Sequence, residues 1–174
     1  MQLKLVQPSM EWEKELIDFR NEQLSLKARF QGASFLERYE SIEEYLAFLD
    51  ACKTPETCPK DLVPSVVYLY VDLDSHDLIG IVNIRLDLND YLLNFGGNIG
   101  YTIVPKYRKQ GHGTNMLKLT LPLAKQHGLD RVLVTCVDFN TASEKIILAN
   151  GGVLEDIRYC APDDVSLKRY WINL

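Results

Sequence analysis

The chain has 174 residues, of which 47% are hydrophobic and 25% are charged, and its formal net charge at pH 7 is −5. These values are typical of an ordinary globular protein whose length fits one domain, residues 1–174, with a sizeable core. The negative charge argues against nucleic acid as a partner, because such binding needs many lysine and arginine contacts to phosphate. It mildly favours a cationic or amine substrate.

The sequence contains no apolar run near the roughly 20 residues that a membrane-spanning helix needs, so no membrane partner is expected. Residues 1–6 alternate like a strand and lack the apolar core of a signal peptide. The cysteines show no metal-ligand spacing, so no metal is expected. They are Cys52, Cys58, Cys136 and Cys160. We therefore expect a cytoplasmic protein with free thiols.

The first half of the chain predicts a strand, two helices and a hairpin. Residues 3–6 form the strand, and an apolar stripe predicts a helix over residues 10–27. Ser41-Ile-Glu-Glu44 matches a capping box and predicts a second helix that ends near Ala51. Residues 66–72 and 78–86 are rich in β-branched residues and flank a polar turn, which predicts an antiparallel pair.

The second half alternates strands and helices. The predicted elements, in order, are a strand over 98–104, a helix over 113–127 that ends at Gly128, a strand over 131–137, a helix over 140–150 that ends at Gly151, and strands over 153–160 and 165–172. The order is therefore β-α-α-β-β-β-α-β-α-β-β, with no repeat or linker. This order predicts one mixed α/β domain.

The loop after the strand predicted over residues 98–104 carries the clearest chemical signal, Arg108-x-x-Gly111-x-Gly113. Glycines at this point allow a ligand to approach the backbone closely. The helix that follows directs its unpaired first N–H groups toward the loop, and Lys106, Arg108 and Lys109 add positive charge. The pattern predicts a site for phosphate or pyrophosphate, and hence a phosphate-bearing cofactor.

Two other phosphate loops fit less well. A P-loop ends in Gly-Lys-Ser/Thr, which is absent here. A Rossmann fingerprint has a third glycine where this chain has Met116, and it belongs to the first βα unit rather than to the seventh element. An enzyme that uses a nicotinamide cofactor stays open as a lesser alternative, which a thermal-shift titration with nicotinamide cofactors would test.

The loop resembles the acetyl-CoA loop of the GNAT superfamily of N-acetyltransferases. The next segments agree, because that superfamily continues with a strand and a short helix that begins Asn-x-x-Ser/Ala, and here residues 132–137 lead to Asn140-Thr-Ala-Ser143. The run from Val134 to Ser143, with Asn150-Gly-Gly152 and Arg169-Tyr-Trp-Ile172, is similar to a bacterial subgroup of predicted acetyltransferases.

The resemblance implies a mostly antiparallel, mixed central sheet flanked by helices, and acetyl-CoA as cosubstrate. The backbone of residues 108–114 would hold the pyrophosphate, the peptide groups of Ile103 and Val104 would bind the pantetheine arm, and an N–H near Val104 would polarise the thioester carbonyl. The implied cofactor-binding residues are Ile103, Val104, Arg108, Lys109, Gln110, Gly111, His112, Gly113, Thr114, Asn140 and Ser143. The His112 side chain is expected to face solvent, and Asn140 serves equally well as a plain helix cap.

The usual catalytic helpers of that superfamily are absent. Asn98 stands where many relatives have a glutamate base, and Ile147 stands where many have a tyrosine acid. The weak substitutes are Asp87, Asp90 and Tyr101. Positioning alone can lower a barrier by about 7–11 kcal/mol, so direct acetyl transfer without a dedicated base stays open.

The acceptor is expected to be a primary amine on a small molecule or a peptide, bound between the first two helices and residues 87–98. Four side chains are expected to line this pocket: Arg29, Phe30, Phe35 and Tyr39. The alternative hypothesis is a CoA-binding sensor or partner module with little or no turnover. A homodimer is compatible with both.

Overall fold

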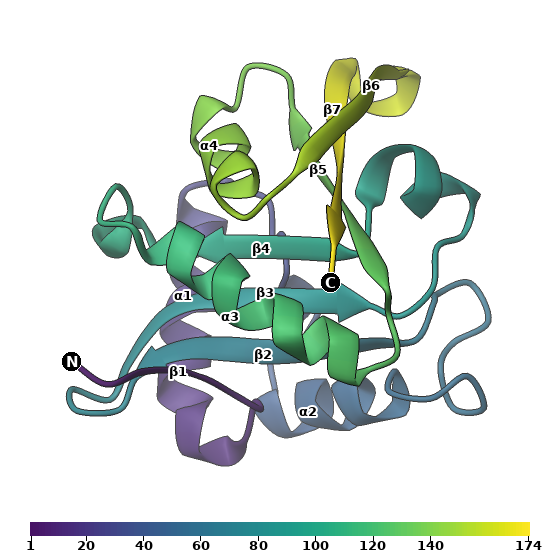
Figure 1. The fold of residues 1–174 in the computed structure, drawn as a ribbon. Helices are drawn as coiled ribbons and strands as arrows, with labels where there is room; N and C mark the ends of the chain where they lie inside the picture. Colours follow the sequence, from purple (N-terminus) through teal and green to yellow (C-terminus); the bar gives the residue numbers. More distant parts are fainter.

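Four strands rich in β-branched and aromatic residues form the first sheet of the computed structural model, which describes residues 1–174 (Figure 1). All neighbours in this sheet pair antiparallel, in the order β1-β2-β3-β4. Its strands are β1 (Leu3–Val6), β2 (Ser65–Asp72), β3 (Asp77–Arg85) and β4 (Ile99–Ile103). β4 is therefore an edge strand.

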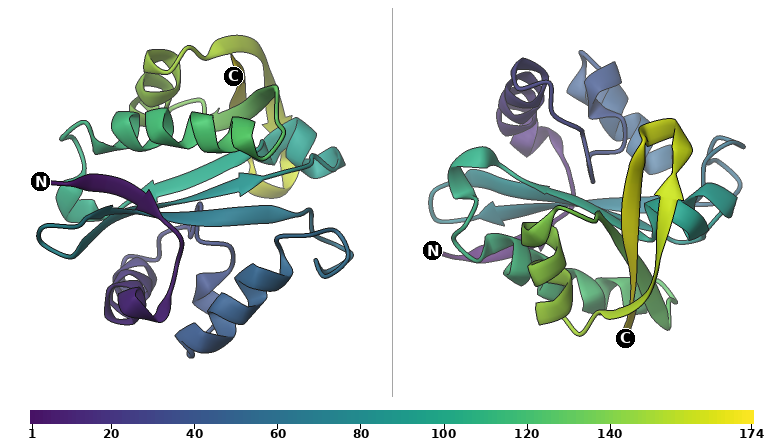
Figure 2. Two further views of the ribbon diagram at one scale, coloured as in Figure 1. Left: turned by 60° about the horizontal axis from the view of Figure 1, so that its bottom comes forward. Right: turned by 90° about the horizontal axis from the view of Figure 1, so that it is seen from above.

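Helices cover both faces of this sheet, which explains why β2 and β3 are buried along almost their whole length. Figure 2 shows α1 (Glu13–Ser25) and α2 (Ile42–Ala51) on one face, and α3 (His112–Gln126) and α4 (Thr141–Ala149) on the other. Side chains of a strand alternate between faces. Accordingly, Val82 and Ile84 pack toward α3 in one core, and Leu69 and Ile81 pack toward α1 and α2 in a second core.

The last three strands form a second antiparallel sheet in the order β5-β7-β6. These are β5 (Arg131–Val137), β6 (Val153–Cys160) and β7 (Val165–Asn173). β5 contributes Val132, Val134 and Cys136 to the core beneath α3 and α4. The outer strand β6 is largely exposed.

The two sheets meet at one end only, where Asn98 precedes β4. The Asn98 N–H donates to the Leu133 carbonyl at 2.7 Å, and the Leu133 N–H donates to Asn98 Oδ1 at 2.8 Å. Gly97 has φ +67°, and a Cβ there would lie 2.5 Å from the Leu133 carbonyl oxygen, so only glycine allows this approach. Beyond this point β5 runs away from β4 (Figure 1), and we use the term V-shaped gap for the region between the diverging backbones of these two strands.

The structure confirms the predicted order of strands and helices, with two differences. The helix predicted over residues 10–27 is a 3₁₀ turn at Met10–Trp12 followed by α1, and the predicted central sheet is divided into two at the gap. A short π-helical turn, η3 (Leu92–Gly96), precedes β4. No helix is both long and apolar enough to cross a membrane.

Candidate active site

The free edge of β4 faces the V-shaped gap. Hydrogen bonds from Val104 N–H to Ile79 and from Arg85 N–H to Asn98 fix which residues of β4 bond to β3. In an antiparallel pair, hydrogen-bonded and non-hydrogen-bonded positions alternate. The peptide N–H groups of Ile99, Tyr101 and Ile103 therefore point away from β3, toward the gap. An extended ligand can pair with them as an additional strand would.

Six consecutive backbone N–H groups, those of residues 109–114, have no hydrogen-bond acceptor within the protein. The first bond of α3 runs from the Asn115 N–H to the Gly111 carbonyl at 3.1 Å. Lys109 and Gly111 have φ of +60° and +84°, which turns successive N–H groups toward one side. No acidic residue occupies the first turn of α3. This segment is a ready anion site.

The two glycines of the loop serve different purposes. At Gly111 a side chain would not clash, since a Cβ there would meet no protein atom within 4 Å. Glycine is favoured at this position because φ is positive. Gly113 is buried, and a Cβ there would lie 2.5 Å from the Ile146 side chain of α4. Gly111 thus shapes the loop, and Gly113 lets α3 pack closely on α4.

The loop side chains are mostly tied to nearby carbonyls. Arg108 Nε donates to the Ile103 carbonyl at 3.0 Å, and Gln110 Nε2 donates to the Lys106 carbonyl at 2.8 Å. The expectation that His112 faces solvent is wrong. The residue is 7% exposed, and its ring packs edge-on against Tyr70 and Tyr107, because helix α3 turns this position toward the core.

A pair of hydroxyl groups, those of Tyr101 and Ser143, joins β4 to α4. Asn140 caps α4 by accepting the Ser143 N–H at 3.1 Å, and Ser143 Oγ lies 2.7 Å from the Tyr101 hydroxyl. Burial raises the pKa of Tyr101 to about 12, against a smaller lowering by the bond to Ser143. The Tyr101 hydroxyl is therefore protonated at neutral pH, and it lies on the same face of β4 as Ile99 and Ile103.

The two positions that lack the usual helpers are structural. Asn98 is 3% exposed, and besides its bonds to Leu133 its Nδ2 donates to the Arg85 carbonyl at 3.0 Å. Ile147 is fully buried in the core beneath α3. Asp87 and Asp90 are exposed in the loop after β3, where Asp87 Oδ1 accepts only the neighbouring Leu88 N–H. Neither carboxylate forms a hydrogen bond or ion pair with β4.

The loop between α1 and α2 crosses the opposite face of β4. Thr102 Oγ1 donates to the Gln31 carbonyl at 2.7 Å, and a Cβ on Gly32 would lie 2.6 Å from the Gly100 carbonyl oxygen. Arg29 forms an ion pair of 3.2 Å with Asp163 in the turn between β6 and β7. This loop and this turn therefore enclose the second side of the gap.

The predicted aromatic lining of the acceptor pocket packs mainly against the helices. Phe30 stacks edge-on against Phe19 of α1, and Phe35 and Tyr39 both stack against Phe48 of α2. Of the four predicted side chains, Arg29 alone reaches across to the second sheet. A half-buried cation that was not predicted, Arg85, lies nearby against Gly100.

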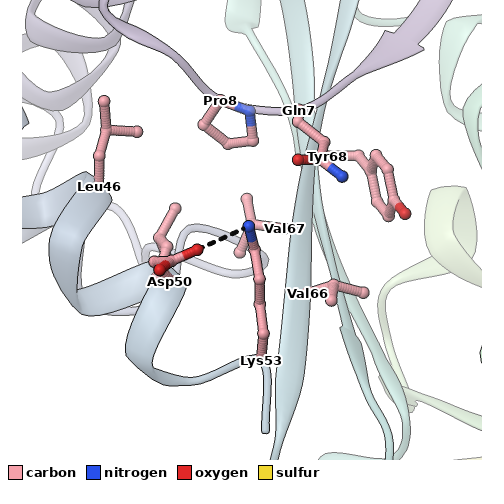
Figure 3. A pocket seen from close by; sticks show the side chains of 9 residues that line it. Gln7, Pro8, Leu46, Asp50, Lys53, Val66, Val67 and Tyr68 are labelled. Carbon is pink, nitrogen blue, oxygen red and sulfur yellow. Dashed lines mark hydrogen bonds and ion pairs between the residues drawn. The ribbon is translucent and has the colours of Figure 1, made fainter. Parts of the chain in front are cut away.

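A separate cavity of about 210 Å³ lies where β1 leaves the edge of β2 (Figure 3). It is lined by Gln7, Pro8, Leu46, Leu49, Asp50, Lys53, Val66, Val67 and Tyr68. None of these residues belongs to the predicted site, and an exposed Lys53–Asp50 ion pair stands at its mouth.

Residues 21–153 match the model of the acetyltransferase (GNAT) domain. The chain belongs to the GNAT acetyltransferase family. It is an N-acetyltransferase that uses acetyl-CoA. The loop agrees with this cosubstrate, because the free N–H groups of residues 109–114 and the open space beside Gly111 suit a diphosphate.

Solved structures share the fold at low sequence identity. The microcin C7 self-immunity acetyltransferase MccE, in complex with acetyl-CoA and AMP, has a TM-score of 0.68 and 16% identity, over 99% of this chain and 93% of that one. The ribosomal L7/L12 acetyltransferase RimL, in complex with CoA, has a TM-score of 0.69 and 16% identity, over 100% of this chain and 95% of that one. Spermidine N-acetyltransferase SpeG from Vibrio cholerae, as an F149A mutant, has a TM-score of 0.63 and 15% identity, over 99% of this chain and 95% of that one. No curated protein matches the chain.

Proposed function

We propose that this GNAT enzyme moves an acetyl group directly from the thioester of acetyl-CoA to a primary amine, with no acyl-enzyme. One observation carries the proposal: six unpartnered N–H groups, at residues 109–114, adjoin an edge strand whose own N–H groups face the same gap. This arrangement suits a long ligand with a diphosphate at one end and amide groups along its length.

The N–H groups of residues 109–114 hold the diphosphate oxygens, and exposed Lys109 adds positive charge. The peptide groups of Val104 are already used within the protein: its N–H donates to the Ile79 carbonyl and its carbonyl accepts from the Tyr107 N–H, at 2.9 Å each. Val104 therefore has no free N–H to donate to the pantetheine arm. The free N–H beside it belongs to Ile103. We assign to Ile103 and Tyr101 the pairing with the arm. Acetyl-CoA itself supplies the activated acetyl thioester.

The chain positions its substrates and supplies one proton donor. The Tyr101 hydroxyl, held by Ser143 at 2.7 Å, lies in the gap and keeps its proton at neutral pH. We assign it the protonation of the departing thiolate. No carboxylate or imidazole is placed to act as base, so the amine loses its proton to water, and orientation provides most of the rate.

The acceptor is a small-molecule or peptide amine. Proteins of the same fold include a spermidine acetyltransferase and an acetyltransferase of ribosomal protein L7/L12, which spans both classes. The acceptor enters from the side enclosed by the α1–α2 loop and the β6–β7 turn, opposite α3 and α4. A substrate complex with the amine on the α3 face would contradict this placement.

A CoA-binding sensor without turnover is the second candidate, because Asn98 and Ile147 replace the usual base and acid and are both fully used in the fold. Release of the CoA thiol from acetyl-CoA, measured against a panel of amines, peptide N-termini and aminoglycosides, separates the two. Amine-dependent release supports the enzyme. Micromolar CoA binding in calorimetry without release from any amine supports the sensor.

A further inference from the structure

Arg85, the last residue of β3, is a half-buried cation with no carboxylate partner. Its side chain lies on the face of the sheet covered by the α1–α2 loop, and Nη2 would be 3.3 Å from a Cβ on Gly100. Nη1 donates to the carbonyls of Gly96 and Gly97, at 3.0 Å each. These two bonds fix the plane of the guanidinium beneath β4.

The other edge of this guanidinium is unused. Neither Nε nor Nη2 of Arg85 has a hydrogen-bond partner, and neither is among the side-chain atoms sealed from solvent without one. Nε–H and Nη2–H point in parallel, and this pair receives a carboxylate with two hydrogen bonds. The structure thus presents a rigid, solvent-reachable fork.

A cation in this setting is costly unless something negative joins it. Burial lowers the pKa of the Arg85 guanidinium, and the two carbonyls supply dipoles but no charge. A half-buried charge without a partner destabilises the fold. A ligand carboxylate would remove that cost, because charge-assisted bidentate bonds are among the strongest hydrogen bonds in proteins.

In the proposed arrangement the pantetheine arm runs along β4 from the diphosphate at residues 109–114, past Ile103 and Tyr101. This brings its reacting end toward Gly100 and away from the position near Val104 expected from the sequence. The fork therefore lies beside the place where the amine reacts. Gly100 precedes Tyr101, whose N–H faces the gap. The other charges around the fork largely cancel: Arg29 is paired with Asp163. The Tyr91 hydroxyl lies near these charges: burial and Asp163 raise its pKa, and Arg29 and Arg85 lower it. Arg85 is therefore the unneutralised cation on the acceptor side of β4.

We propose that Arg85 binds a carboxylate on the acceptor, so that the acceptor is an amine of the amino-acid type, with its carboxylate close to the amine, and not a polyamine. This inference rests on the proposed function and narrows it to one substrate class. Gly100 keeps a side chain away from the guanidinium, since a Cβ there would lie 3.3 Å from Nη2, and Gly32 lets the α1–α2 loop pack directly on the backbone of β4.

The test compares matched acceptors and matched variants. Wild-type enzyme is assayed for CoA-thiol release with each of the common α-amino acids, with the same amino acids as carboxamides, and with spermidine. We expect kcat/KM for the best free acid to exceed that for its carboxamide and for spermidine by roughly 10-fold or more. Arg85→Met should reduce the ratio of acid to carboxamide to near one through KM, and Arg85→Lys should retain part of it.

Arg131→Met is the control, because Arg131 is exposed and stacks on Trp171 at the start of β5, away from the gap. It should leave the ratio of acid to carboxamide unchanged. A purely structural role for Arg85 would lower both activities equally and leave their ratio intact, which would overturn the inference. A wild-type enzyme that prefers carboxamides or spermidine would overturn it too, while leaving the acetyltransferase proposal standing.

A binding arm keeps the inference testable without turnover. Calorimetry with CoA-saturated protein compares N-acetyl amino acids with their carboxamides. Tighter binding of the acids by wild type, lost in Arg85→Met, supports the fork as a carboxylate site even if no amine is acetylated. Equal binding of both series, or binding of neither, overturns it.

Discussion

Asn98 shows how one side chain can replace a catalytic role with a structural one. Its backbone and side chain together make four hydrogen bonds that join β3, β4 and β5 at the closed end of the gap. A glutamate there could not donate to the Arg85 carbonyl, so the residue type follows from the joint. The absence of the usual base is therefore a property of the scaffold.

Replacement of Asn98 by alanine should strongly destabilise the protein. The change leaves the buried Leu133 N–H and the Arg85 carbonyl without partners, and each unsatisfied buried group costs about 1–3 kcal/mol. Urea unfolding followed by circular dichroism measures the loss. Asn21→Ala, on the exposed face of α1, should change stability by no more than about 0.5 kcal/mol. Equal stability of the two variants would contradict the role of Asn98.

Tyr101 is the residue to which we assign proton donation. Tyr101→Phe should lower kcat by roughly 10-fold or more, because the donor is lost. The affinity for CoA, measured by calorimetry, should stay within a few-fold. Tyr68→Phe removes a hydroxyl that instead lies 3.0 Å from His127, at the other end of α3, and should keep kcat. If Tyr101→Phe retains full kcat, the thiolate is protonated by water.

At the scale of elements, the loop between β4 and α3 and the helix it opens form the cofactor site. Gly111→Val should abolish or strongly weaken CoA binding while the protein stays folded. A β-branched side chain at φ +84° strains the loop and projects into the open space that the diphosphate occupies. The measurements are calorimetric titration with CoA and thermal unfolding.

Gly128→Val is the matched control for this variant. Gly128 follows the opposite end of the same helix, has φ +91°, and also has no atom within 4 Å of its Cβ position. Both variants should lose similar stability, and Gly128→Val should keep its CoA affinity. Equal CoA affinity in the two variants would remove the loop from the site.

Local signals predicted the elements, and partners distant in the sequence decided the details of the site. Ser41, Asn140 and Gly128 mark helix ends through contacts within three or four residues, so a single sequence reveals them. The bond between Tyr101 and Ser143, and the bonds of Arg85 to Gly96 and Gly97, depend on how strands and loops pack. The only sequence signal for Arg85 is a cation that ends an apolar strand.

His112 illustrates the same limit from the other direction. A histidine between two glycines of a polar loop suggests exposure, yet the start of α3 places it between Tyr70 and Tyr107. The direction of the first helical turn, which is set by packing of α3 on the sheet, decides the burial of this side chain. Its backbone N–H still belongs to the proposed anion site.

At the scale of the whole molecule, the net charge of −5 and the local charge of the acceptor side differ in sign. The overall value mildly favours a cationic substrate, whereas the unpaired guanidinium of Arg85 favours an anionic group beside the amine. The local charge carries more weight here, because a half-buried group acts at short range with little screening.

Stability should fall in alkaline solution. Burial raises the pKa values of Tyr45, Tyr101 and Tyr170 above the ordinary value of 10.0, to about 12 for Tyr101. A group whose pKa is higher in the folded state holds its proton longer there, so the unfolded state ionises first and is stabilised relative to the folded state as pH rises. Urea unfolding should show a decline in stability that begins near pH 9, because burial also raises the pKa values of the Cys52 and Cys136 thiols to about 12 and about 11, and that steepens from about pH 10 upward. A flat profile to pH 12 would contradict this burial.

The central claim is that the backbone N–H groups of residues 109–114 bind the diphosphate of CoA. Amide hydrogen exchange, resolved by residue in ¹⁵N NMR spectra with and without saturating CoA, tests it most directly. The free protein should exchange these six amides quickly, since they lack acceptors, and bound CoA should slow them at least about tenfold while the amides after Gly128 stay unchanged. CoA that binds without protecting residues 109–114 would contradict the account.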